Sequence, residues 1–423
     1  MVYLPMEREE VYQFVSNYHR LYLKRHAGMT ASNYDKLELQ AHEPPDILKE
    51  CYRKLQEDAY SALKSSEIED VDQFVETLEV AQYYPKLSVM SIASQLSKHL
   101  EHIEPKKELP RTLVALSSIY RMRFDLKEDS AVLEQTLERL TDSLSPETDL
   151  STTCYALGKM KIIGDRLVDR LEIAIEEASH KTTTNKKQLL FNTLDLYSRL
   201  PQRYYPHRLN SFFMDALNRY PLHLNEKVRV LTALSRLDDI ESSQFRLISP
   251  EVLNLFLMDI VTHNINSLNM HSRLRLFNLL RQSSNNQQQL HQLNILTEDN
   301  IKYLQRAYLQ NQRSTVSLFH EDVGKCLTEI GYTHHKEIFL ETYFVDFLVE
   351  RPQGKTVLEV DGPSHFWKVE NNFLANRDNC KREGWWHSRG YSFGSVPFYL
   401  WSKCTTGAHK RVLVRSAVDG KQP

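Results

Sequence analysis

The chain is poor in the residues that make tight turns, and it contains few cysteines. Its 423 residues include only 12 glycines and 15 prolines, too few for an all-β protein full of tight turns, so we expect mostly helix. The five cysteines lie far apart, no Cys-x-x-Cys motif occurs, and their odd number argues against a disulfide framework. We therefore predict a protein of a reducing compartment without a structural zinc site.

Long apolar runs and the motifs of several enzyme classes are also missing. The longest apolar runs, such as residues 255–258, are far shorter than the roughly 20 residues that a helix needs to cross a bilayer, so we expect no membrane partner. No Gly-rich phosphate-binding loop, Gly-x-Ser-x-Gly or His-Glu-x-x-His motif is present. The length and the 41% apolar content are typical of a protein with two or three globular domains.

Positive charge is concentrated near the C-terminal end. Residues 1–150 carry a net charge of −9 (18 Lys and Arg, 27 Asp and Glu), and residues 151–364 carry +1 (25 against 24). Residues 365–423 carry +6 (10 against 4), although the whole chain has a net charge of only −2. A basic segment on a near-neutral chain indicates that this segment meets a polyanion, although a solvated basic tail has the same composition.

The first residues allow two interpretations. Residues 11–27 contain no acid, carry three basic residues, and place apolar side chains at helical spacing. Such an amphipathic basic helix could direct the chain to an organelle. It could equally be the first helix of the fold, and we place it there, in a helical extension over residues 1–70.

A short apolar signature recurs along the middle of the chain. A small residue followed by leucine occurs at Leu78, Leu116, Leu157, Leu194 and Leu234, and a looser copy ends at Leu280. The spacings are 38, 41, 37, 40 and 46 residues, and a second helical pattern follows most copies. A two-helix unit of this size buries its faces only by stacking on its neighbours, so we predict an α-solenoid over residues 71–312. An irregular all-α domain is the alternative.

The solenoid prediction leaves its ligand open. Solenoids expose long concave surfaces that bind peptides or nucleic acids. The Gln- and Asn-rich run 282–294 predicts a loop that closes the array. Residues 199–208 combine arginines with two tyrosines and a histidine, which suits either an RNA contact or a polar loop between helices.

The pattern changes after residue 313 to that of a small α/β domain, which we place at residues 315–423 with a basic C-terminal tail. Gly331 is a plausible stop for the first helix of this domain. The elements we expect are a helix over 316–330, one or two strands within 338–349, a strand over 356–361, a helix over 373–383 and a strand over 392–400.

Three acids of this domain are predicted to converge. Glu359 and Asp361 share one face of a strand because alternate residues point the same way. A hairpin turning about residues 352–353 places Asp346 opposite Glu359. Such a cluster is either a divalent-metal site or a set of caps at the strand ends.

These residues resemble a known family. Val345-Asp346-Phe347, the run 358–366 (Leu-Glu-Val-Asp-Gly-Pro-Ser-His-Phe) and the closing run 396–401 (Val-Pro-Phe-Tyr-Leu-Trp) are similar to the RAP domain, named for its abundance in apicomplexan proteins. The resemblance covers roughly residues 320–404. Family members typically carry helical repeats before this domain, as in the FAST kinase-like and octotricopeptide or heptatricopeptide repeat proteins. They are mostly mitochondrial or plastid RNA-binding proteins, and some act in ribosomes.

The resemblance also implies a nuclease-like fold with one departure. The RAP domain is similar to the restriction-endonuclease-like fold, whose nucleases place an Asp on one strand and Glu-x-Lys on the next. Asp346 and Glu359 match the acids, but Asp361 stands where the lysine is expected. That lysine stabilises the charge of the transition state, and an aspartate does the opposite. Lys381 could replace it only by folding back over the acids, and only this nuclease alternative would need Mg²⁺.

Basic and aromatic residues after the acids suit a single-stranded RNA, because cations meet phosphates and rings stack on bases. One of Trp385 and Trp386 is expected to be a core residue instead. The candidate RNA-binding residues are His365, Arg377, Lys381, Arg382, Trp386, His387, Arg389, Lys403, Lys410, Arg411 and Arg415.

We therefore expect an organellar RNA-binding protein without a resident cofactor. Because the solenoid is nearly neutral, we favour a component or assembly factor of a mitochondrial ribosome, with ribosomal RNA and other proteins as partners; a plastid location is the alternative. Rival hypotheses are a magnesium-dependent endoribonuclease using Asp346, Glu359, Asp361 and Lys381, and a protein scaffold without RNA contact.

Overall fold

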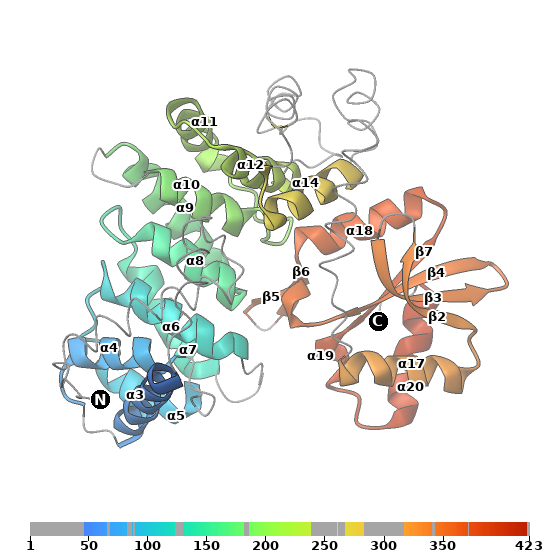
Figure 1. Cartoon of the computed structure of the whole chain (residues 1–423), viewed down its shortest axis with the longest axis horizontal. Helices are drawn as coiled ribbons and strands as arrows, with labels where there is room; N and C mark the ends of the chain where they lie inside the picture. Colours follow the sequence, from blue (N-terminus) through green and yellow to red (C-terminus); the bar gives the residue numbers. More distant parts are fainter. Residues whose placement is uncertain are drawn as a thin grey trace.

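The chain forms a helical lobe followed by a domain built on a β-sheet, as a computed structural model shows (Figure 1). The structure describes residues 46–65, 68–82, 87, 89–122, 130–181, 186–237, 260, 267–282, 317–340, 343–370 and 372–420. Two predictions lie outside these residues: the helix over 11–27 and the loop over 283–294.

The helical lobe consists of consecutive antiparallel helices. Their bounds are α3 (Asp46–Ser65), α4 (Val71–Ala81), α5 (Val89–Leu100), α6 (Glu108–Met122), α7 (Ser130–Ser143), α8 (Leu150–Met160), α9 (Asp165–Ser179), α10 (Lys186–Tyr197), the short η1 (His207–Leu209), α11 (Asn210–Arg219), α12 (Leu224–Leu237) and α14 (Met270–Gln282). Helix starts carry polar caps where the sequence offers them. Asp70 accepts the backbone N–H of Gln73, and Asp149 accepts that of Thr152. The described part of the predicted N-terminal extension, α3, packs on α4 and α5 and shares the core of the lobe.

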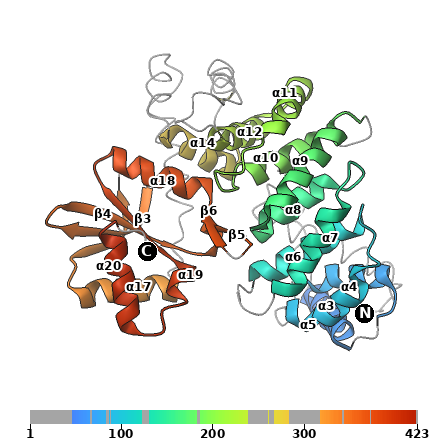
Figure 2. The ribbon, with the colours of Figure 1, turned by 180° about the vertical axis from the view of Figure 1, so that it is seen from behind.

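The helices stack in two rows, as the repeat spacing predicts. One row runs α4, α6, α8, α10, α12, α14, and the other runs α5, α7, α9 and then η1 with α11 (Figures 1 and 2). The signature leucines from Leu78 to Leu234 all lie buried in the first row. Helical repeats therefore build this lobe, and each helix pair completes its core only with the next pair.

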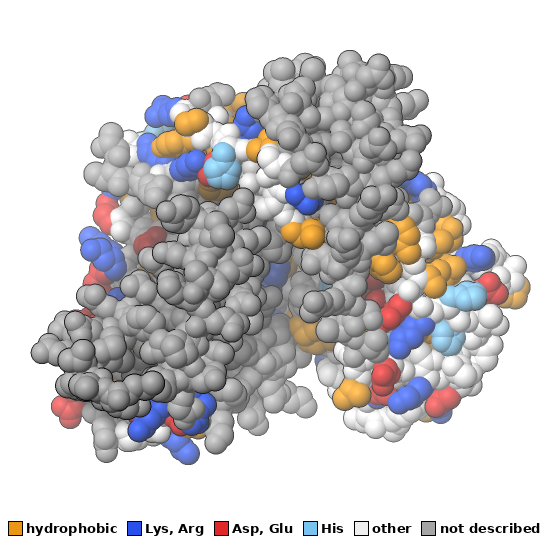
Figure 3. All heavy atoms as spheres, viewed as in Figure 1, with side chains coloured by type: hydrophobic (Ala, Val, Ile, Leu, Met, Phe, Trp, Pro, Cys, Tyr) orange, Lys and Arg blue, Asp and Glu red, His pale blue; other side chains and the backbone are white. Residues whose placement is uncertain are grey.

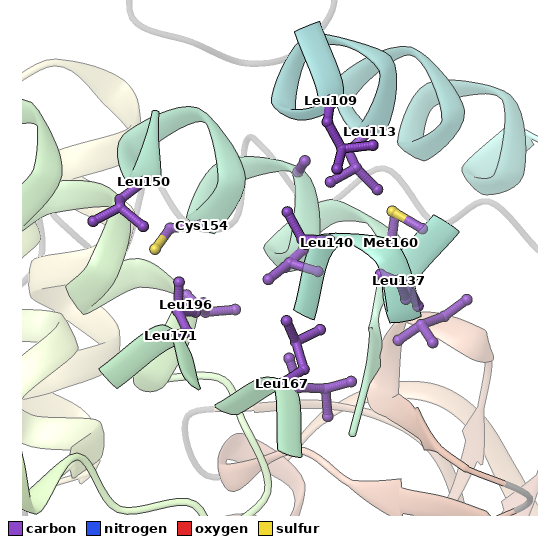
Figure 4. Packing of buried hydrophobic residues seen from close by; sticks show 14 of the residues in the cluster. Leu109, Leu113, Leu137, Leu140, Leu150, Cys154, Met160, Leu167, Leu171 and Leu196 are labelled. Atoms are coloured by element: carbon purple, nitrogen blue, oxygen red, sulfur yellow. The ribbon is translucent and has the colours of Figure 1, made fainter. Parts of the chain in front are cut away.

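The core of the lobe is continuous from repeat to repeat. Figure 4 shows leucines of α6, α7, α8, α9 and α10 with Cys154 and Met160, all pointing into the space between the helices. Cys154 is one of these buried side chains, and burial raises the pKa of its thiol to about 12. It therefore behaves as a small apolar residue.

The C-terminal domain carries a four-stranded mixed sheet with strand order β2-β3-β4-β7. Neighbours β2, β3 and β4 are antiparallel, and β4 pairs with β7 in parallel. Helices α17 and α20 cover one face, and α18 packs on the other through Trp386 (Figures 1 and 2). The bounds are α17 (Leu318–Ile330), β2 (His334–Leu340), β3 (Tyr343–Arg351), β4 (Gly354–Asp361), η3 (Pro363–His365), β5 (Phe366–Val369), β6 (Asn372–Ala375), α18 (Arg377–Ser388), β7 (Ser392–Pro397), α19 (Phe398–Trp401) and α20 (Gly407–Val418).

Several expectations for this domain need correction. Residues 372–375 form strand β6, so the helix expected over 373–383 begins at Arg377, where Asn376 caps it. The strand expected over 392–400 ends at Pro397. The predicted basic tail is helix α20, because Leu413, Val414, Ala417 and Val418 form an apolar face that packs on the sheet. The helix stop at Gly331 is confirmed, with its backbone in the left-handed region at φ 91°.

The two lobes are docked through a hairpin that the sequence did not reveal. Strand β5 pairs in parallel with β1 (Ile162–Ile163) of the helical lobe and antiparallel with β6. Trp367 of β5 is fully buried in the core of the helical lobe, and its indole N–H donates to the carbonyl of Arg199 at 2.7 Å. The ammonium of Lys161 lies 4.8 Å from the Trp367 ring centroid. The hairpin thus joins the two lobes into one unit.

Candidate functional site

The predicted convergence of three acids is confirmed. In the β3–β4 hairpin Phe347 lies opposite Leu358, which is the predicted register and brings Asp346 next to Glu359. Glu359 and Asp361 share one face of β4 and contact the same guanidinium, that of Arg382. We name Asp346, Glu359, Asp361 and Arg382 the acid–arginine cluster.

Arg382 places its guanidinium between two buried carboxylates. Its Nη1 lies 3.1 Å from Glu359 Oε2, and its Nη2 lies 3.3 Å from Asp361 Oδ1. The carboxylate side chains are 7% and 4% exposed, and that of Arg382 is 17% exposed. Asn379, one helical turn earlier on α18, accepts a further hydrogen bond of 2.7 Å from Nη2 and orients the guanidinium.

Further side chains complete the hydrogen bonding of the acids. The backbone N–H of Val360 donates to Asp346 Oδ2 at 2.7 Å, and the hydroxyl of Ser395 donates to Asp361. His365 lies with Nδ1 3.3 Å from Asp361 Oδ1 and 2.9 Å from Asn379 Oδ1. His320 of α17 stacks on Phe347 and lies 3.4 Å from Asp346. A polar network therefore links α17, both hairpin strands, α18 and β7.

The acids of the cluster have opposite pKa shifts. Burial raises the pKa of Glu359 to about 8, with Asp346 and Asp361 adding to the rise and Arg382 opposing it. Burial also acts on Asp346, but His320 and the Val360 N–H outweigh it and hold that pKa below its usual value. Burial disfavours the charge on Arg382, but the three acids raise its pKa overall. The pKa of Glu359 is therefore shifted towards neutral pH, whereas that of Asp346 is shifted away from it.

The acid–arginine cluster does not fit a divalent cation. A magnesium ion bound to Glu359 and Asp361 would have to displace the guanidinium that both carboxylates contact, or lie beside that positive charge. Among the described residues no group of three or more His, Cys, Asp or Glu is arranged to hold a metal ion. What the cluster provides is a neutralised, hydrogen-bonded link between the sheet and α18.

Lys381 does not fold back over the acids, which was the condition for it to replace the missing lysine in the nuclease alternative. The ammonium of Lys381 donates to the carbonyl of Ser235 in α12 at 2.7 Å, on the side of α18 that faces the helical lobe. Arg377, four residues earlier, is buried and donates to the carbonyls of Gln202 and Tyr204 at 3.3 and 2.8 Å. These two residues hold the lobes together, which also leaves them poorly placed for RNA.

The loop 199–208 is a docking loop between the lobes. Its carbonyl at 199 accepts a hydrogen bond from Trp367, and its carbonyls at 202 and 204 accept hydrogen bonds from Arg377. Arg203 pairs with Asp165 at 2.7 Å. For these residues the sequence left open an RNA contact or a polar loop between helices. The structure favours the polar loop, which the C-terminal domain contacts.

The two tryptophans of α18 have different environments. Trp386 is fully buried against Val345, Leu348 and Val357 of the sheet, so its predicted role in stacking on a base is wrong. Trp385 is half-buried, and the guanidinium of Arg389 lies 4.6 Å from its ring centroid. Arg389 and His387 are exposed at the end of α18.

The remaining basic candidates lie on or near α20. Lys410 lies 3.4 Å from Asp322 and over the ring of Trp401, and Arg411 pairs with Glu329 at 2.8 Å. Lys403 and Arg415 are exposed and form no ion pair within the described residues. Of the candidates in this region, these two are the cations most open to a ligand.

The partners His320, Asn379 and Ser395 were not anticipated. They come from three elements distant in sequence, and no local spacing marks them. Only the position of Asn379 three residues before Arg382 is a usable signal, because residues at that distance are neighbours on a helix.

Comparison with protein-family models and with curated proteins finds no match to this chain. Among the described residues, no helix has the length and apolar character needed to cross a membrane.

Proposed function

We propose that this chain is an organellar RNA-binding protein whose C-terminal domain is of the RAP type and holds RNA without cleaving it. The topology supports the resemblance to the restriction-endonuclease-like fold. A helix precedes an antiparallel hairpin, and α18 then crosses over to β7, which pairs in parallel with β4. Asp346 and Glu359 occupy adjacent strands, as in nucleases of that fold.

Arg382 is the observation that carries the proposal. In the endoribonuclease alternative, a cation at these acids would have to bind magnesium or stabilise the transition state. Arg382 instead fixes Glu359 and Asp361 in a buried contact within the protein. The arrangement favours a nuclease-like module whose acids now serve its own stability.

Exposed cations and aromatics on the same domain support RNA as the ligand. Lys403 and Arg415 are exposed without an ion pair among the described residues. Trp385 with Arg389 offers a ring and a guanidinium side by side, a combination that binds a base and its phosphate.

A role inside a ribonucleoprotein suits the rest of the surface. Most cations of the helical lobe for which a partner is resolved pair with acids of the same lobe, as in Arg111 with Glu79 and Arg166 with Asp142. Such a surface supports protein contacts better than broad binding to a polyanion. We therefore propose ribosomal RNA as the ligand and a mitochondrial ribosome, as component or assembly factor, as the setting.

Fluorescence anisotropy of the full chain with a labelled single-stranded RNA of about 15 nucleotides tests RNA binding, since site sizes are of this order. The dissociation constant should rise with salt between about 50 and 200 mM. The double variant Lys403→Glu with Arg415→Glu should weaken binding, and the salt slope should fall by about one for each lost phosphate contact. Lys355→Glu, a charge reversal at the exposed tip of the β3–β4 hairpin, is the matched control.

Absent binding, or binding that does not change with salt, would favour the protein scaffold instead. Equal loss of affinity in the Lys355→Glu control would show that net charge alone matters, and would remove Lys403 and Arg415 from the interface.

A further inference from the structure

An ion pair of the same kind joins successive helices of the first row at two places in the helical lobe. An arginine five residues before a signature leucine pairs with an acid that directly follows the signature leucine of the preceding repeat. Arg111 contacts Glu79 in this way with two hydrogen bonds of 2.9 and 2.7 Å. Arg229 contacts Asp195 from the corresponding position, but its Nε and Nη2 both donate to one oxygen, Oδ2, at 2.9 and 2.5 Å. Each pair joins neighbouring repeats, and that of Arg111 engages both oxygens of its acid.

The step that follows the pair of Arg229 and Asp195 has the arginine but lacks the acid. Arg275 of α14 holds the same position, five residues before Leu280, but Ser235 stands where the acid of the preceding repeat is expected. The hydroxyl of Ser235 donates to Thr232, and its carbonyl accepts the ammonium of Lys381. Arg275 is half-buried and has no hydrogen-bond acceptor within the described residues.

Three further arginines interact electrostatically with Arg275. Arg199 follows α10, and Arg229 and Arg236 lie on α12. Arg275 is within electrostatic range of the other three and of Asp195, and Arg199 is within range of Arg229, Arg236 and Asp195. We name them the arginine cluster: Arg199, Arg229, Arg236 and Arg275.

The acids near the arginine cluster do not balance it. Asp195 contacts Arg229, and Asp378 of α18 lies 2.8 Å from Arg236. Counting only the residues that the structure describes, four guanidinium groups therefore face these two carboxylates. Arg199, like Arg275, has no hydrogen-bond acceptor among the residues that the structure describes.

Burial and the neighbouring arginines act together on the pKa values of Arg275 and Arg199. Burial lowers the pKa of Arg275 to about 10; Asp195 opposes the shift, and the other three arginines deepen it. The pKa of Arg199 is lowered as well, first by burial, with Arg229 and Arg236 adding to the effect. A doubly charged anion at this position would remove the repulsion.

The cluster lies where the two lobes meet. Arg236 and Ser235 of α12 contact α18, and the carbonyl of Arg199 accepts a hydrogen bond from Trp367. Lys and Arg side chains are visible between the two lobes in Figure 3. A strand of nucleic acid that crosses from the helical lobe to the C-terminal domain would pass this junction.

We propose that the arginine cluster binds a backbone phosphate of the RNA, with Arg199 and Arg275 as its donors. Guanidinium groups match phosphate oxygens by paired hydrogen bonds, and Arg199 and Arg275 have donors to spare. The inference rests on the proposed function and names the site through which the helical lobe takes part in it. Phosphate is also offered by free polyphosphates, so the test includes both sources.

The experiment compares the double variant Arg199→Gln with Arg275→Gln against Arg111→Gln in the full chain. Arg111 holds the same repeat position but keeps its acid, so it is a matched control. By anisotropy with the labelled RNA, the double variant should bind at least about tenfold more weakly, because charged hydrogen bonds are lost. Arg111→Gln should bind like the wild type.

Thermal unfolding without ligand separates this role from a structural one. The double variant should keep or raise the melting temperature, because it removes repulsion, whereas Arg111→Gln should lower it. A melting temperature that falls further in the double variant than in Arg111→Gln would mark Arg199 and Arg275 as structural residues and overturn the inference.

Inorganic pyrophosphate serves as the second probe. If the wild type binds RNA and the double variant binds it equally well, the inference fails while the proposed function stands. If the wild type binds no RNA, the proposed function fails, and with it the RNA ligand of this cluster. Stabilisation of wild type and Arg111→Gln by pyrophosphate, but not of the double variant, would then assign the cluster to a free polyphosphate. No stabilisation would overturn the anion site itself.

Discussion

At the scale of residues, the decisive contact joins Arg382 to Glu359 and Asp361. The sequence predicted the acids well, because the two-residue period of a strand and the register of a short hairpin are local. It misassigned the cation. Lys381 and Arg382 are adjacent, but a helix turns by about 100° per residue, so one faces the helical lobe and the other the acids. Only the way in which α18 packs on the sheet determines which of the two cations faces the acids.

Replacing Arg382 by alanine should strongly destabilise the domain. The change leaves buried carboxylates without their cation, which typically costs about 3–5 kcal/mol. Urea unfolding measures the loss, with Arg389→Ala on the exposed end of α18 as control. A loss no larger than that of the control would show that the contact with Arg382 adds no stability.

The raised pKa of Glu359 predicts a specific pH dependence. A carboxyl whose pKa rises from 4.5 to about 8 on folding binds more protons in the folded state, so its contribution to stability falls as pH rises through that window. The variant Glu359→Gln keeps the shape of the side chain but replaces the carboxyl group by an amide that does not titrate. The free energy of unfolding of the wild type, measured relative to Glu359→Gln, should therefore decrease by a few kcal/mol between about pH 5 and pH 8. A difference that is constant across this range would contradict the assignment.

At the scale of elements, the helical repeats were predictable and the connections around the sheet were not. The repeat leucines recur at regular spacing, so each copy reinforces the others. Strands β5 and β6 have four residues each, which is too short for an alternating pattern of apolar and polar residues to be recognised. The position of β5 is fixed by its own Trp367, whose side chain is buried in the core of the helical lobe. Helix α20 was hidden because its basic residues dominate the composition of its segment, while four apolar residues fix it to the sheet.

The close approach of α20 to β7 makes Gly394 irreplaceable. A Cβ at this position would lie 2.1 Å from the carbonyl oxygen of Ala417 and 2.8 Å from its carbon, so the helix backbone would have to move. Gly394→Ala should cost at least about 1–3 kcal/mol by overpacking. Gly384→Ala in α18 meets nothing within 4 Å and should instead stabilise by about 0.5–1 kcal/mol. Thermal unfolding measures the melting temperature of both variants. Equal changes in melting temperature would contradict the close approach of α20 to Gly394.

At the scale of the whole molecule, the β5–β6 hairpin makes the two lobes interdependent. Trp367 fills the core of one lobe while its chain belongs to the other, and Arg377 and Lys381 add hydrogen bonds across the same junction. The expected boundary between residues 312 and 315 therefore separates the two lobes in sequence, but the two lobes share part of one hydrophobic core.

Trp367→Ala should uncouple the lobes. The change leaves a large cavity and removes the hydrogen bond to Arg199, at a cost of about 3–5 kcal/mol. Calorimetry should show one transition for the wild type and two for the variant. Two separate transitions already in the wild type would contradict the interlocked arrangement.

The central claim is that a nuclease-like module holds RNA without cutting it. The most direct test incubates the full chain with a labelled single-stranded RNA in the presence of magnesium, retains the complex on a filter at low salt, and determines the length of the recovered RNA. We predict retained RNA of full length, released by raising the salt. Shortened RNA whose production is abolished by Asp346→Ala with Glu359→Ala would contradict the claim, and so would a failure to retain RNA at low salt.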